Sequence, residues 1–232
     1  MSATAFAGTE QRRLARVMRV GLILLCLIGA AAALRRIVAL ASPARNVPGQ
    51  LAELDAAFAT RPVLTLVHIV PGLLLVSLVP FQFSRRFRGR HLRAHRWIGR
   101  IVIILGLVIG LSAILMSRNP IGGGVEIAAI GFFDALFLFA LTKALIHIRR
   151  REVALHREWI IRAMSIALGV ATVRPIMGVF FATSTLTGLK PQQFFGSAFW
   201  IGFSLTYVAG ELWIGYTRSS PYVAPLVTRN DS

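Results

Sequence analysis

The chain has 232 residues, of which 56% are hydrophobic and only 15% are charged, and its formal net charge is +17. This balance excludes an ordinary soluble domain and indicates a membrane protein. The arginines lie in short clusters between apolar segments rather than along one solvated face, so we attribute the charge to membrane topology and do not expect nucleic acid as a partner.

Six apolar stretches are long enough to cross a bilayer. A hydrocarbon core of about 30 Å needs about 20 helical residues. The predicted spans cover residues 17–40, 63–83, 97–117, 125–147, 158–182 and 195–216. We therefore predict an all-α fold, a polytopic transmembrane bundle of six spans. The chain then divides into a basic N-terminus (1–16), a six-helix transmembrane domain (17–216) and a tail (217–232).

Arginines are distributed unequally between the predicted loops. The N-terminus and the loops after the second and fourth spans hold the clusters, which are Arg12, Arg13, Arg16 and Arg19; Arg85, Arg86, Arg88, Arg90, Arg93 and Arg96; and Arg149, Arg150, Arg151 and Arg157. Positive charge accumulates on the cytoplasmic side of membrane proteins. This distribution predicts a protein of the bacterial inner membrane with both termini in the cytoplasm.

The first predicted span allows a second interpretation. Its basic start and apolar stretch also resemble a signal peptide, with Ala39 and Ala41 at the spacing of a cleavage site. Arg35 and Arg36 intervene before that site, which favours a retained span. The later helices keep their orientation under either interpretation.

Two connections have recognisable local patterns. The polar segment between the first two spans predicts a short interfacial helix over residues 50–59. The segment "SRNPIGGG" (117–124) predicts a tight turn between the third and fourth spans, because Pro120 ends a helix and the three glycines permit positive φ.

Two similar motifs stand at the start of predicted spans. "LRAHRWIGR" (92–100) and "ALHREWIIR" (154–162) each contain a His-Arg pair, a Trp and a further Arg. Helical spacing places His95 on one face with glycines at 99, 106 and 110, and places His156 on a stripe of small residues. Small residues mark helix contacts in membranes, so we expect the two imidazoles to face each other near the cytoplasm. The motifs also suggest a repeat of two related hairpins.

Two interpretations of this His/Arg/Trp site need no reaction. In the first it is structural: arginine supplies inside charge, and both tryptophans lie in the aromatic belt at the headgroups. In the second it binds membrane lipids through an anionic headgroup, or a quinone or small anion, because guanidinium groups form paired bonds with oxyanions. The ligand-binding candidates are Arg96, Trp97, Arg100, Arg157, Trp159 and Arg162.

A third interpretation is a redox protein with a single b-type haem. Imidazoles on facing helices can serve as axial ligands of haem iron, and the candidates are His95 and His156. A relay across the bilayer usually needs two haems and four ligands, whereas the outer half offers only His68. We therefore expect one haem at most, near the cytoplasm.

Ionisable residues inside the membrane are costly and are usually paired or functional. Asp134 and Arg174 have similar predicted depths, so an ion pair between them is one expectation, with His68 completing an outer polar layer. Gln82 and Glu211 are expected to join the two motif histidines in an inner layer. A small transporter that uses the outer layer is a weaker alternative, since only Pro175 interrupts a span there.

The sequence does not indicate an enzyme. The lone Cys26 lies in an apolar stretch, which excludes an intramolecular disulfide and a zinc cluster. Glycine-rich phosphate loops and hydrolase elbows are absent from the sequence. We therefore predict no catalytic residues and no metal site.

The motifs resemble a bacterial membrane family catalogued as domain of unknown function 2306. The resemblance covers about residues 65–180 and comprises the His68 segment leading to "PFQF", "HRWIGR", "HREWIIR" and the "VRP" around Arg174. It implies a multi-pass membrane protein. It implies no particular activity.

Overall fold

The computed structural model describes residues 3–42 and 49–218, and these residues form helices and short connections only. The helices are α1 (Ala3–Ala41), α2 (Gly49–Ala59), α3 (Pro62–Phe83), α4 (Arg85–Arg90), α5 (Leu92–Met116), α6 (Gly123–Arg149), α7 (Val153–Thr187) and α8 (Pro191–Arg218). To within one residue, each predicted span lies inside one of the six long helices, and the expected interfacial helix is α2. The all-α prediction is confirmed over the described part of the chain.

Apolar composition makes most of these helices suitable for a membrane. Five of them, α1, α3, α5, α6 and α7, are long and apolar enough to cross a bilayer. The helix α8 does not meet the same measure, because its glycines and polar residues, Glu211 among them, lower its mean hydropathy. The chain is thus a helical multi-pass membrane protein.

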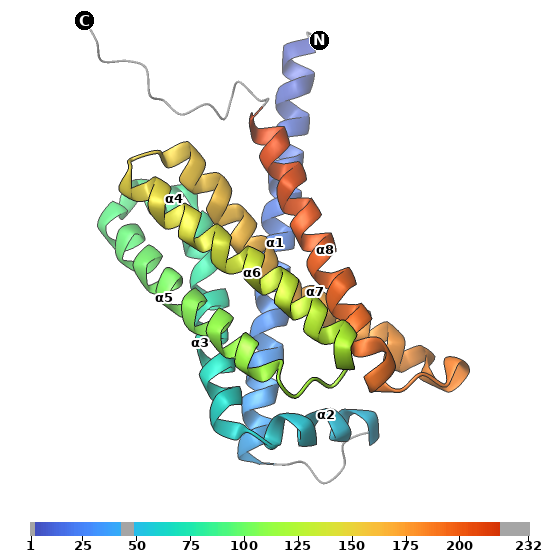
Figure 1. Ribbon diagram of the computed structural model, residues 1–232. Helices are drawn as coiled ribbons and strands as arrows, with labels where there is room; N and C mark the ends of the chain where they lie inside the picture. Colours follow the sequence, from blue (N-terminus) through green and yellow to red (C-terminus); the bar gives the residue numbers. More distant parts are fainter. Residues whose placement is uncertain (1–2, 43–48, 219–232) are drawn as a thin grey trace, which may run out of the picture.

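Successive long helices run in alternate directions (Figure 1). α7 packs against α6 and α8, which also contact each other, and against α1, while α3 lies between α1 and α5. One end of the bundle, here named the α2 end, carries α2 and residues 117–122. The opposite end, named the α4 end, carries α4, residues 150–152 and the last turn of α8. Both motif histidines belong to helices that begin at the α4 end.

Glycines allow the helices to approach closely. Gly106 and Gly110 of α5 are buried against Leu141 and Leu138 of α6, as the predicted helical face requires. Between α7 and α8 the approach is tighter, because a side chain at Gly169 would collide with the backbone and ring of Phe203. Close packing at these glycines holds the helix pairs together, because the hydrophobic force between helices is weak in lipid.

The predicted glycine turn connects α5 and α6. Gly123 has φ +64°, a left-handed conformation that glycine adopts without strain. The backbone N–H of Gly122 donates to the carboxylate of Glu126 at 2.6 Å. Glu126 is buried, and this bond gives its carboxylate a hydrogen-bond partner inside the protein.

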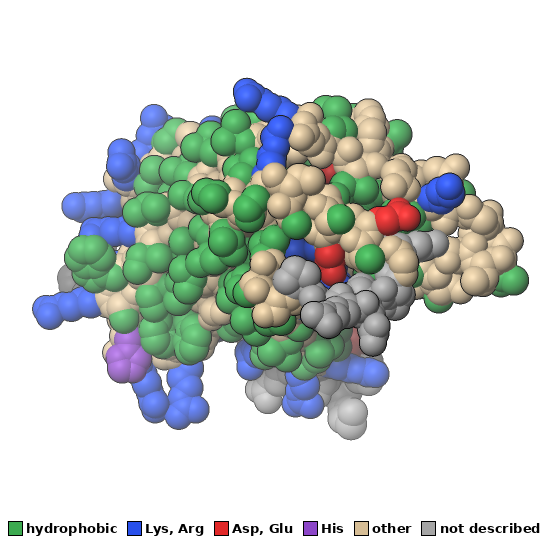
Figure 2. Space-filling model, turned by 90° about the horizontal axis from the view of Figure 1, so that it is seen from below, with side chains coloured by type: hydrophobic (Ala, Val, Ile, Leu, Met, Phe, Trp, Pro, Cys, Tyr) green, Lys and Arg blue, Asp and Glu red, His purple; other side chains and the backbone are tan. Residues whose placement is uncertain are grey.

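The outer surface of the bundle is strongly apolar. Figure 2, which looks from the α2 end, shows a broad field of hydrophobic side chains with Lys and Arg side chains gathered at its margins. Large exposed hydrophobic side chains occur on all six long helices, and examples are Leu27, Val63, Ile104, Phe132, Val179 and Leu212. Such a surface is expected where helices face lipid.

Candidate functional site

The two motif histidines come together at the α4 end. His156 lies near enough to His95 to interact with it electrostatically. The Nδ1 atom of His156 is 2.8 Å from the carbonyl oxygen of Ala144 on α6, and as a donor to that oxygen it leaves Nε2 with a free lone pair. His95 Nδ1 is buried and has no hydrogen-bond partner among the described residues. The two side chains thus lie at the same end of the bundle, and that their rings face each other stays a prediction.

The first motif is open to its surroundings. Trp97 is 64% exposed, and the guanidinium of Arg100 lies over its ring at 4.9 Å. Arg96 is exposed as well. None of these side chains takes part in an ion pair in the described structure, so their donors are available to a ligand.

The second motif is tied to α8 instead. Arg162 Nε is 2.6 Å from the Glu211 carboxylate, and its Nη2 is 3.0 Å from the other oxygen. Glu158 binds Arg218 through both carboxylate oxygens and lies 3.9 Å from Arg162. Among the predicted ligand donors, Arg162 is therefore already neutralised by carboxylates of the chain itself.

The remaining side chains of the second motif also face the bundle. Both terminal nitrogens of Arg157 donate to Thr217 Oγ1 at 3.1 Å. Trp159 packs edge-on against Phe139, with ring centroids 5.4 Å apart, and under Arg162 at 4.6 Å. The two motifs, which the sequence suggested to be equivalent, thus have different surroundings.

Two further residues were expected in the inner polar layer. Gln82 fulfils the expectation in part, because its Nε2 donates to the backbone carbonyl of His95 at 3.2 Å. Glu211 is directed to Arg162 rather than to either histidine. Glu158 was not among the residues predicted from the sequence. The signal that could have identified it is that the second motif contains a carboxylate with no counterpart in the first.

The expected ion pair between Asp134 and Arg174 is wrong. Asp134 faces Gly110 of α5, and its Oδ2 is buried without a hydrogen-bond partner among the described residues. Arg174 faces α1 and α2 and lines a cavity with Arg35 and Arg36. Two side chains at the same depth on different helices can point in different directions. Here Asp134 points toward α5, whereas Arg174 points toward α1 and α2.

Substitution of this pair should give additive effects. Arg174→Leu and Asp134→Leu alter separate environments, and sites without shared partners usually combine within about 0.5 kcal/mol. Thermal unfolding of the two single variants and the double variant in detergent measures the coupling. Recovery of stability in the double variant would contradict this geometry.

His68 also has a different partner from the one expected. Its Nδ1 lies 3.0 Å from the hydroxyl oxygen of Ser112 on α5. Arg174 is near enough to act on His68 electrostatically, whereas Asp134 is not part of this contact. The predicted outer layer therefore retains His68 and Arg174 and loses Asp134.

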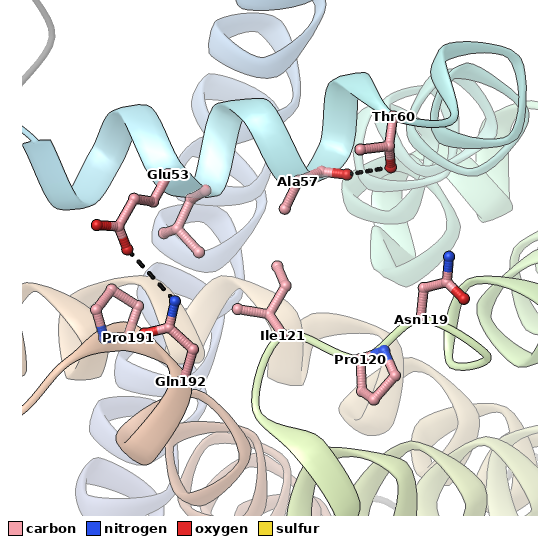
Figure 3. A pocket seen from close by; sticks show the side chains of 9 residues that line it. Glu53, Ala57, Thr60, Asn119, Pro120, Ile121, Pro191 and Gln192 are labelled. Atoms are coloured by element: carbon pink, nitrogen blue, oxygen red, sulfur yellow. Dashed lines mark hydrogen bonds between the residues drawn. The ribbon is translucent and has the colours of Figure 1, made fainter.

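A cavity of about 340 Å³ lies at the α2 end (Figure 3). It is bounded by α2, by the connection that contains Asn119 and Ile121, and by the start of α8. Gln192 donates to the Glu53 carboxylate at 3.3 Å across one side. The lining contains a single charged side chain, so the cavity offers little for a specific ionic ligand.

Comparison with known families gives one match. A family model described as a predicted membrane protein (DUF2306) matches residues 65–214. Comparisons with curated proteins and with solved structures found no match. The matched region extends past the resemblance at residues 65–180 and includes most of α8. Because it covers more than half of the 232 residues, the chain belongs to the DUF2306 family of predicted membrane proteins.

Proposed function

We propose that this protein lies in the bacterial inner membrane and binds an anionic headgroup or a small anion at its cytoplasmic α4 end. The arginine clusters at this end support the orientation through the positive-inside rule. The start of α1 and the end of α8 lie toward the same end, which supports cytoplasmic termini (Figure 1). The proposal involves no catalytic step.

The proposed topology includes α8 as a sixth crossing. Its 28 residues extend about 42 Å, more than a hydrocarbon core requires. It packs along α7 in the opposite direction (Figure 1). Its less apolar face, with Thr206 and Gly210 buried, is turned toward the bundle rather than toward lipid.

One observation carries the binding proposal: the cations of α4 and early α5 lack internal counter-charges. These cations are Arg85, Arg86, Arg88, Arg90, Arg93, Arg96 and Arg100. None of them forms an ion pair in the described structure. Three carboxylates at this end, Glu152, Glu158 and Glu211, bind His147, Arg218 and Arg162 instead. The exposed Trp97 lies among the unpaired cations, as an aromatic anchor at the headgroups would.

Binding of phosphatidylglycerol should depend on the first motif. Two arginines near an anionic membrane surface contribute about 1 kcal/mol each, or about 30-fold together, and paired bonds to a bound headgroup add to this. Arg96→Gln with Arg100→Gln should therefore weaken the affinity by more than about 30-fold. Native mass spectrometry of the detergent-solubilised protein, titrated with this lipid, measures the change.

The matched control removes two exposed arginines at the same end of the bundle, through Arg149→Gln and Arg150→Gln. The control variant should lose less affinity, about 30-fold at most, because Arg149 and Arg150 lie outside the first motif and contribute only the general attraction to an anionic surface. Equal losses in the two variants would show that overall charge, and not this site, retains the lipid.

A single b-type haem is the second candidate function. The observation that favours it is the pair of imidazoles: His156 Nδ1 lies against a backbone carbonyl, and His95 Nδ1 is buried without a partner. A histidine that ligates a metal usually donates its other ring N–H to a carbonyl or carboxylate, as His156 can do here. These two residues would supply the axial ligands.

The haem proposal predicts a Soret band in protein produced with ample haem. His95→Ala or His156→Ala should abolish the band, whereas His91→Ala, an exposed histidine at the same end, should leave it unchanged. Visible spectroscopy of the purified protein makes the measurement. A colourless wild-type preparation would eliminate this candidate.

A further inference from the structure

Three arginines from two helices converge on one cavity at the α2 end. Arg35 and Arg36 belong to the end of α1 and Arg174 belongs to α7, and together they line a space of about 190 Å³. The rest of the lining is apolar and consists of Ala32, Leu51, Leu54, Met177, Gly178 and Phe181. A cationic group and an apolar wall thus share one small space.

The charges of this cavity do not balance within the described structure. Asp55 of α2 receives two bonds from Arg35, at 3.0 and 2.9 Å, and a further bond from Arg36. Arg174 has no carboxylate partner, and its Nε is buried without a hydrogen bond. Three guanidinium groups against one carboxylate leave a net charge of +2.

An uncompensated guanidinium is costly at this position. Charged side chains inside a membrane protein are normally paired, line a polar pathway or bind a ligand. The neighbours of Arg174 increase the cost of its charge, because both Arg35 and Arg36 are close enough to repel its guanidinium electrostatically. The carboxylate of Asp55 already binds those two cations.

We infer that this cavity binds an oxyanion, the phosphate or carboxylate head of an amphiphile, with Arg174 as its principal donor. Guanidinium groups match the geometry of these heads and form two parallel charged bonds with them. The apolar part of the ligand lies along Leu51, Met177 and Phe181. This site goes beyond the proposed α4-end function and shares no residue with it.

The size of the cavity limits the ligand. A water molecule occupies about 30 Å³ of liquid, so a cavity of about 190 Å³ holds a head of about six heavy atoms and not a whole phospholipid. The tail leaves beside Gly178, which is exposed and where an added Cβ would meet nothing within 4 Å.

Two variants test the assignment by different routes. Arg174→Gln removes the donor, and Gly178→Leu fills the opening while all three arginines remain. The matched control is Arg61→Gln, which removes an exposed arginine near the same end of the bundle. The purified full-length protein is titrated with inorganic phosphate and, separately, with dihexanoyl phosphatidate, and thermal unfolding reports binding because a ligand of the folded state raises the unfolding temperature.

The expected result is a rise in unfolding temperature for the wild type and for Arg61→Gln. The dissociation constant should increase at least tenfold in both test variants. A response to inorganic phosphate assigns the site to a free anion, and a response to phosphatidate alone assigns it to a lipid head. Without a ligand, Arg174→Gln should unfold at the wild-type temperature or above it, because it removes an unpaired cation.

The inference is overturned if neither probe shifts the wild type, or if Arg174→Gln and Gly178→Leu respond as the wild type does. A purely structural Arg174 would give a lowered unfolding temperature in Arg174→Gln and normal phosphate binding in Gly178→Leu. If Arg174→Gln does not fold, Gly178→Leu alone decides, since a Cβ at Gly178 collides with no neighbouring atom and this variant should fold.

Discussion

Gly169→Leu should destabilise the protein by about 3 kcal/mol, near the upper end of the usual cost of overpacking. A Cβ at this position would already lie 3.0 Å from the Cα of Phe203, so the backbone of α8 would have to move. A leucine adds three more carbon atoms in the same direction. The unfolding temperature in detergent should therefore fall sharply.

Gly131→Leu provides the matched control for this prediction. Gly131 is an exposed glycine of α6, and a Cβ there would meet nothing within 4 Å. Its replacement should leave stability unchanged or increase it slightly, because glycine is a poor helix former. A similar loss in both variants would mean that the close approach of α7 and α8 is not the cause.

Glu211→Leu should cost about 2 kcal/mol by leaving Arg162 without its main partner. The Arg162 side chain is only 14% exposed, and the other carboxylate in reach, Glu158, is 3.9 Å away. Breaking a well-buried pair costs about 3–5 kcal/mol, and the partial exposure of Glu211 reduces that value. Replacing both residues with leucine should recover at least half of the loss, since no charge is then stranded.

Arg100→Leu is the control, because Arg100 holds the corresponding place in the first motif and has no ion pair in the described structure. Its effect on stability should stay within about 0.5 kcal/mol. Unfolding of the wild type, Glu211→Leu, Arg162→Leu and the double variant in one detergent completes the double-mutant cycle. Losses that add strictly for Arg162 and Glu211 would contradict the bidentate contact.

The helices and the glycine turn were predictable because their causes are local. A run of about 20 apolar residues defines a span wherever it occurs. The turn between α5 and α6 required only glycine at a left-handed position, which Gly123 supplies. The buried face of α5 with Gly106 and Gly110 followed from helical periodicity alone.

The pairing of charged side chains was not predictable to the same extent. Depth along a helix follows from the sequence, but the direction of a side chain relative to its neighbours depends on which helices are adjacent. Asp134 and Arg174 have similar depths and face different partners, α5 in one case and α1 with α2 in the other. Likewise, the bonds of Arg35 and Arg36 with Asp55 exist because α2 folds back on α1.

The extra glutamate in the second motif changes the direction in which its tryptophan points. In the first motif Trp97 follows His95 by two positions, a rotation of about 200°, whereas Glu158 makes the interval three positions, or about 300°. The surroundings of the two indoles differ accordingly: Trp97 is 64% exposed, whereas Trp159 is partly buried and packs against Phe139. One additional residue between His and Trp therefore accompanies an exposed indole on one helix and a packed indole on the other.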